Sequence, residues 1–298
     1  MKNNFLNFFI FIIVLSFFIG NTAYSKELQF NATEIQSLEK GNKIIAKNGV
    51  EVIDPKGITI TAEQGEYDKI RSIIKVKHNV QVNDLINNYV LITGEAVYFL
   101  NEDKIITKKE TVINVEEKYT IETSDITYDR SLKEIFSEKE TTVFDNNNNI
   151  LNANNFNLSI KAKIIEAKNV NLVDNELNEY NIEIAKLNLE TDEVAGKDLS
   201  VKFNKKYFKK DNDPRLKAKS IIIEKENIFF KKGIFTTCKK RKDKCPPWTM
   251  SAEEIIHDKP NKTINYKNAW LKVYDKPILY FPKFFHPDPT VKRQSGFL

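Results

Sequence analysis

The chain has 298 residues, of which 41% are hydrophobic and 29% are charged. This length suits one large domain or two ordinary ones, and the composition excludes intrinsic disorder as the default state. The formal net charge of +5 is too small to indicate nucleic-acid binding.

The first 25 residues have the features of a targeting segment. A lysine at the second position precedes an apolar run over residues 5–20, and Ala23 and Ser25 place small side chains where a signal peptidase reads them. The pattern predicts a signal peptide over residues 1–25, cleaved before Lys26, and an exported mature chain. The alternative is an uncleaved membrane anchor, although the run is shorter than the roughly 20 residues that a bilayer requires.

Internal repeats organise the region 26–201. Five segments share a short apolar alternation, a polar turn, a second alternation and then an aromatic residue or leucine followed by charge. They begin at Val50, Val80, Thr111, Thr141 and Val170. Tyr67, Tyr98, Tyr128 and Leu158 mark the frame, at separations of 31, 30 and 30 residues. A regular period with two strand-like runs per unit predicts a stack of similar supersecondary units.

Within each unit the hydrophobic period is two. Ile58, Ile60 and Ala62, for example, alternate with threonines, as in strands with one solvated face. Turn residues such as those at 54–57 separate the runs. We therefore expect antiparallel hairpins that stack along an axis and share one elongated interior.

The predicted fold class is all-β, an elongated antiparallel β-jelly roll or folded-over β-solenoid. A parallel β-helix fits less well, because each unit has two runs and lacks Asn or Gly ladders. If the sheets splay, the interior is an apolar groove wide enough for acyl chains; if they close, it is the dry core of a sandwich. The candidate lipid-binding positions are Ile58, Ile60, Val80, Val82, Ile92, Val112, Ile121, Val143, Leu151 and Leu172.

Residues 202–244 differ from the repeats in charge. They contain sixteen Lys or Arg and five Asp or Glu, a local net charge of +11. We expect a basic, loop-rich extension here, either a solvated surface or a contact for lipid phosphates or an anionic membrane. The export signal disfavours nucleic acid as the partner.

The chain has two cysteines, Cys238 and Cys245. In an oxidising exported compartment this pair predicts a disulfide that closes a small lysine-rich loop. Free or intermolecular thiols and a metal site are the alternatives, but His257 and His286 do not complete a recognised zinc pattern.

Motifs of catalysis are not apparent. The three histidines lie outside Ser/His/Asp or HExxH contexts, and the nine glycines form no phosphate-binding loop. The pairs His257-Asp258 and His286-Asp288 are interpreted as structural. We therefore expect a protein that is not an enzyme and that uses no metal or cofactor.

The C-terminal stretch is the most distinctive. From Cys245 onward, "INYKNAWLKVYDKPILYFPKF" and "HPDPTVKRQSGFL" resemble the junction between the periplasmic domain and the membrane barrel in the LptD family of lipopolysaccharide-assembly proteins. The region 245–298 is therefore expected to be a junction segment. Its motif residues are His286, Pro287, Asp288, Pro289, Arg293, Ser295 and Gly296. The repeats resemble the OstA-type fold that LptA, LptC and the start of LptD share.

This resemblance implies a function. In that family the β-jelly roll receives lipid A acyl chains in an apolar groove from an LptA-like bridge protein, which is joined by edge-strand addition. It passes the lipid to a barrel that is plugged by the lipoprotein LptE. The chain would then take part in lipopolysaccharide transport at the periplasmic face of the outer membrane.

The resemblance also leaves alternatives open. The family barrel would follow "SGFL", whereas this sequence ends at Leu298, so we expect a truncated or split gene. A free-standing LptA-like periplasmic bridge is the second interpretation. A carbohydrate-active β-solenoid enzyme and a purely structural envelope protein with a closed dry core are the third and fourth.

Overall fold

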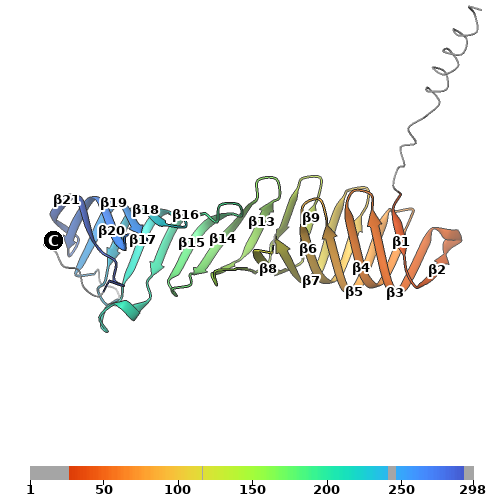
Figure 1. The fold of residues 1–298 in the computed structure, drawn as a ribbon, viewed down its shortest axis with the longest axis horizontal. Helices are drawn as coiled ribbons and strands as arrows, with labels where there is room; N and C mark the ends of the chain where they lie inside the picture. The colour runs from red at the N-terminus through yellow and green to blue at the C-terminus, as the bar shows by residue number, and fades with distance from the viewer. Residues whose placement is uncertain (1–26, 116, 241–245, 292–298) are drawn as a thin grey trace, which may run out of the picture.

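The computed structural model describes residues 27–115, 117–240 and 246–291. They form an elongated, all-β body of antiparallel strands (Figure 1). The predicted fold class is confirmed. Among these described residues, no helix has the length and apolarity to cross a bilayer. The predicted signal peptide lies outside them.

The described strands are numbered along the chain as in Figure 1. The first half of the body contains β1 (Gln29–Asn31), β2 (Glu34–Leu38), β3 (Lys43–Asp54), β4 (Ile58–Asp68), β5 (Ile73–Asp84), β6 (Tyr89–Phe99), β7 (Lys104–Val115), β8 (Tyr119–Ser124), β9 (Thr127–Asp129), β10 (Glu134–Ser137), β11 (Thr141–Asp145), β12 (Ile150–Ala153) and β13 (Asn155–Ser159). The second half contains β14 (Ile164–Val173), β15 (Glu179–Asn188), β16 (Val194–Lys202), β17 (Arg215–Ile223), β18 (Asn227–Thr236), β19 (Trp248–Asp258), β20 (Thr263–Val273) and β21 (Lys276–Pro287). Two 3-10 turns accompany them, η1 (Glu39–Gly41) and η2 (Lys205–Tyr207).

The sheet is folded lengthwise into two layers. One half of β7 pairs with β8 and the other half with β9. The two layers then continue separately through β11 and β12 and through β10 and β13, and they meet again on β14. Each long strand therefore crosses from one layer to the other, so the layers enclose one interior.

A line of irregular residues marks the fold between the layers. A residue with positive φ interrupts every long strand that runs in one of the two directions: Asn48, His78, Lys109, Asn169, Asp198, Lys232 and Asn268. The ladder shifts register at the same level between β3 and β4, β4 and β5, β5 and β6, and β6 and β7. Such bulges bend a strand and let it change layers.

Buried threonine hydroxyl groups form hydrogen bonds with one another and with the backbone along this fold line. Thr111 donates to Thr93 at 3.0 Å, and Thr107 and Thr111 are 2.8 Å apart. Thr107 also accepts a hydrogen bond from the backbone N–H of Ile126 at 3.0 Å. The threonines thus replace ladder hydrogen bonds where the strands bend, since a buried unpaired amide is costly.

The free ends of the two layers form two rims. We call the turns after β3, β5, β7, β11, β14, β16 and β18 the A rim, and the turns after β4, β6, β9, β13, β15, β17 and β19, with the end of β21, the B rim. The two rims belong to different layers, on opposite sides of the interior. Whether the interior is open depends on whether the rims touch.

The sheet continues through residues 202–240, where the sequence predicted a loop-rich extension. β17 and β18 carry buried inward residues, including Leu216, Ile221 and Phe230. The exposed positions between them hold lysines such as Lys217 and Lys231. The high local charge of these lysines made the alternation of apolar and polar residues difficult to recognise in the sequence. The basic region thus adds a hairpin to the same two-layered body.

Gly196 on β16 tests how tightly the two layers pack. An added Cβ would lie 2.6 Å from Ile182 Cγ2 and 3.1 Å from Ile221 Cγ2. We expect Gly196→Ala to lower the free energy of unfolding by about 1–3 kcal/mol, measured by chemical denaturation. Gly94→Ala is the matched control, because no atom lies within 4 Å of its added Cβ. Equal effects of the two substitutions would contradict the packing described here.

Candidate functional site: an open cleft between the rims

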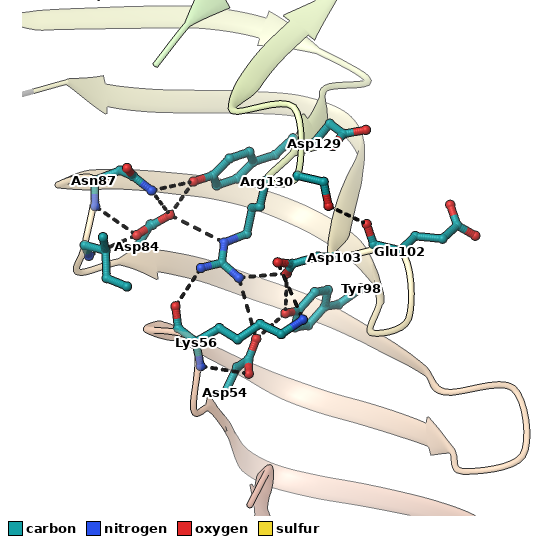
Figure 2. A network of polar contacts seen from close by, with 12 residues as sticks. Asp54, Lys56, Asp84, Asn87, Tyr98, Glu102, Asp103, Asp129 and Arg130 are labelled. Atoms are coloured by element: carbon teal, nitrogen blue, oxygen red, sulfur yellow. Dashed lines mark hydrogen bonds and ion pairs between the residues drawn. The ribbon is translucent and has the colours of Figure 1, made fainter. Parts of the chain in front are cut away.

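A buried ionic cluster joins the rims in the N-terminal half (Figure 2). Arg130, in the B-rim turn after β9, points across the interior to Asp54 and Asp84 at the ends of β3 and β5 on the A rim. Its Nη1 lies 2.7 Å from Asp103 Oδ1, and its Nη2 donates to the carbonyl of Lys56 at 2.6 Å. We call these five residues, with Tyr98 and Tyr128, the Arg130 clasp.

Both tyrosines of the clasp reach the opposite rim in the same way. Tyr98 donates to Asp54, and Tyr128 donates to Asp84, each across a separation of 44 residues. The two contacts are therefore one repeat apart, like the tyrosines themselves. In these two repeats the tyrosine at the frame position therefore links one rim to the other above the apolar interior.

Burial makes the charges of the clasp interdependent. The side chain of Arg130 is 8% exposed and that of Asp84 is 0% exposed. Burial would lower the pKa of Arg130, but contacts with Asp103 and Asp84 outweigh it and raise this pKa. Burial would raise the pKa of Asp84, yet hydrogen bonds from Tyr128 and Asn87 and the charge of Arg130 lower it. Arg130 and Asp84 therefore both favour their charged forms in the closed structure.

A second contact joins the rims farther along the body. Lys118 Nζ lies 2.5 Å from Asp192 Oδ1, and Tyr119 donates to the same carboxylate. Lys118 belongs to the A rim, Tyr119 begins β8 next to it, and Asp192 belongs to the B rim. The interior is thus bridged at its mouth from the first repeats to this point.

Beyond Asp192 a cleft opens between the rims. Its cavity volume is about 130 Å³. Its apolar lining consists of Phe203, Phe208, Leu216, Ile228, Phe230, Phe235, Ile255, Ile264 and Tyr266. A narrower extension toward the N-terminus is lined by Val143, Leu151 and Leu172 and shares Tyr180, Ile228 and Lys259 with the main cleft. The result is one apolar groove in the C-terminal half.

The mouth of the cleft is polar. Asp174, Asn178 and Asn204 lie on its A side, and His257, Lys259 and Asp288 lie on its B side. An apolar floor beneath a polar mouth is suited to an amphiphile whose tails are buried and whose head remains in water.

The segment after β21 is fastened at this mouth. Asp288 Oδ2 lies 2.5 Å from His257 Nε2, and Asp288 Oδ1 accepts from the backbone N–H of Thr290 at 2.7 Å. Burial would raise the pKa of Asp288, but these contacts outweigh it and lower the pKa to about 2. His286, near the end of β21, is hydrogen-bonded to Tyr266 at 3.0 Å.

Asp288 should make the stability depend on pH. Because its folded pKa of about 2 lies below the ordinary value of 3.8, the carboxylate stabilises the fold above about pH 4, and this contribution is lost as the pH falls toward 2. We expect Asp288→Asn to lower the free energy of unfolding at pH 7 by about 2 kcal/mol and to flatten its decline between pH 4 and 2. Denaturation at several pH values tests this. Asp275→Asn, at an exposed turn residue, is the control, and identical pH profiles for all three proteins would contradict the assignment.

The predicted groove residues divide into two sets. Eight are buried in the interior: Ile58, Ile60, Val80, Val82, Ile121, Val143, Leu151 and Leu172. Of these, Val143, Leu151 and Leu172 line the cleft, while the first five lie in the bridged half. Whether any of them binds lipid stays a prediction.

Ile92 and Val112 lie on the outer face, so their expected inward orientation is wrong. They are cross-strand partners, and Ile92 is 45% exposed. On β6 the buried residues on either side of Ile92 are Leu91 and Thr93. Because strand side chains alternate, an error of one position reverses the face.

Other predicted site residues fall partly outside the described chain. Cys238 is half-buried and Cys245 lies outside the described residues, so the disulfide stays a prediction. Of the junction motif, Asp288 and Pro289 line the cleft mouth and His286 and Pro287 end β21, whereas Arg293, Ser295 and Gly296 lie outside the described residues. Within the described ranges, no cluster of His, Cys, Asp or Glu has the geometry to hold a metal ion.

The fold and the cleft define a class: an elongated, two-layered β-jelly roll with an apolar interior that opens along one edge. Comparison with known proteins points to a particular group. Over 114 residues, 38% of this chain, the sequence is 28% identical to the LPS-assembly protein LptD of Hahella chejuensis. Over 94 residues, 31% of this chain, it is 31% identical to LptD of Nitrosomonas europaea.

A third relative, LptD of Idiomarina loihiensis, is 27% identical over 99 residues, 32% of this chain. About a third of the chain is therefore similar to LptD proteins, which confirms the resemblance predicted from the sequence. The matched parts span only 12–13% of the length of these relatives. No family model matches the chain.

Proposed function

We propose that this chain takes part in lipopolysaccharide assembly at the outer membrane, as a periplasmic domain that holds acyl chains in the C-terminal cleft and passes them onward. The observation that carries the proposal is the cleft itself. It is apolar along its floor, polar at its mouth and open between two rims. The similarity to LPS-assembly proteins supports the nature of the ligand.

The proposed site lies farther along the body than the positions that the sequence predicted. Lipid would contact Leu216, Ile228 and Ile264 in the open half rather than Ile58 and Ile60 in the bridged half. Acyl chains would enter sideways, between the rims, because this is where the interior meets solvent.

The ends of the sheet suggest how partners would join. β1 and β2 are short strands that pair with opposite halves of β3 at the N-terminal end. Short edge strands leave room for an added strand, which fits an LptA-like bridge protein that delivers the lipid. An LptE-like lipoprotein would be met on the outer-membrane side.

The proposed role is non-catalytic. The most concentrated carboxylates, Asp54, Asp84 and Asp103, surround Arg130 in the clasp, where they are paired rather than presented to a substrate. This arrangement favours a lipid conduit over the carbohydrate-active enzyme. A free-standing bridge would use the same cleft.

Binding of intact and deacylated lipopolysaccharide to the purified mature chain tests the proposal. If the cleft holds acyl chains, the intact lipid binds and complete deacylation weakens binding by at least about 100-fold, since several buried methylene groups are lost. Equal binding of both forms would place recognition on the sugar and overturn the proposal.

A further inference from the structure

The Arg130 clasp joins the two rims through buried ion pairs, although packed apolar side chains could also cover the interior. A buried ion pair is often no more stabilising than a well-packed hydrophobic group, because each ion loses its hydration. Arg130 nevertheless meets Asp54, Asp84 and Asp103 at 3.7, 3.6 and 2.7 Å. Such a closure is specific in geometry and spans two rims that belong to different layers.

The tyrosine–aspartate contacts of the clasp do not continue into the next repeat, and nearer the cleft the Lys118–Asp192 contact joins the rims instead. Tyr98 and Tyr128 each cover one repeat, but the next frame position is Leu158, and the residue 44 positions before it is Asn114. Leu158 is 0% exposed and takes the place of the tyrosine in the apolar core. The cleft extension begins in this region, at Val143 and Leu151.

The interior beneath the clasp has the same apolar character as the cleft. Ile60, Val82 and Leu91 are each 0% exposed there. Apolar lining alone therefore does not explain why the open groove is confined to the C-terminal half. The clearest difference between the halves is the set of contacts that holds the rims together.

We propose that the Arg130 clasp holds the rims of the first repeats closed against lipid and that, with the Lys118–Asp192 contact next to the cleft, it sets the N-terminal limit of the acyl-chain site. The inference rests on the proposed function. Arg130 acts here as a positioning residue: it does not touch the lipid but decides which part of the interior the lipid reaches. When the clasp is broken, the rims can part and the groove lengthens toward β3.

Photolabelling with a fatty acid tests this directly. The full mature chain is incubated with tetradecanoic acid that carries a diazirine near its methyl end, and labelled peptides are mapped by mass spectrometry. In the unaltered protein, labels are expected within residues 143–290. In Arg130→Met, labelling within residues 50–130 should rise at least about ten-fold, because the loss of a buried charge partner strongly disfavours the closed rims.

Two further variants make the outcome decisive. Asp103→Asn weakens the clasp while Arg130 keeps Asp54 and Asp84, so it should give an intermediate rise even if Arg130→Met folds poorly. Arg71→Met removes an exposed arginine with one ion pair, to Asp68, and should leave the pattern unchanged. Equal labelling of both halves in the unaltered protein, or an unchanged pattern in both clasp variants, would overturn the inference. An absence of labels between residues 143 and 290 would instead refute the proposed function.

Discussion

Replacing Arg130 with methionine is expected to lower the free energy of unfolding by about 3–5 kcal/mol. The substitution leaves Asp54 and Asp84, whose side chains are 5% and 0% exposed, without their main cationic partner. A buried carboxylate without a counter-charge must stay unpaired or take up a proton, and both are costly. Chemical denaturation of the mature chain at neutral pH measures the loss.

Two comparisons separate the buried charge from general effects of the substitution. Arg71→Met, where the side chain is 76% exposed, should change the stability by less than about 0.5 kcal/mol. Arg130→Met combined with Asp84→Asn should recover part of the loss, since one uncompensated charge is removed. A loss below about 1 kcal/mol in Arg130→Met would mean that the clasp contributes little to closing the rims.

Filling the cleft should weaken lipid binding without unfolding the protein. Ile264 on β20 is half-buried and lines the cleft beside Tyr266 and Asp288. We expect Ile264→Trp to occupy the space needed by an acyl chain and to weaken binding of tetradecyl phosphate at least about ten-fold, equivalent to roughly two methylene groups kept in water. Calorimetric titration measures the affinity.

Ile222→Trp is the matched control for this prediction. Ile222 lies on β17 and is 38% exposed on the outer face, so the same enlargement should leave the affinity unchanged. If Ile264→Trp binds the ligand as well as the unaltered protein, acyl chains do not occupy this part of the cleft.

The fold was largely predictable from the period-two alternation. Alternating apolar positions such as Ile58 and Ile60 predicted the strands, and the regular spacing of the frame residues predicted the repeat. Where a bulge interrupts a strand, the alternation does not predict which side chains face the interior. For Ile92 and Val112 the predicted face was wrong by one position. The many lysines of residues 202–240 led to the prediction of a loop, although the apolar residues Leu216, Ala218 and Ile221 already indicated a strand.

The location of the open cleft was less predictable. The sequence pattern of an apolar strand is the same whether the opposite layer packs against it or leaves a cleft. Periodicity therefore did not distinguish Ile60 in the bridged half from Ile228 in the cleft. One available signal was overlooked: Tyr98 and Tyr128 each follow an aspartate by 44 residues, whereas Leu158 does not. The Arg130 contacts depend on tertiary placement across the rims and leave no comparable spacing pattern.

The most direct measurement is photo-crosslinking of lipopolysaccharide to the mature chain from single positions. A photoreactive amino acid at Ile264 faces the cleft, and the same residue at Ile222 faces solvent on the outer side of the sheet. The account predicts a lipopolysaccharide adduct from Ile264 and none from Ile222. Adducts from both positions, or from Ile222 alone, would contradict the claim that the open C-terminal cleft holds the acyl chains.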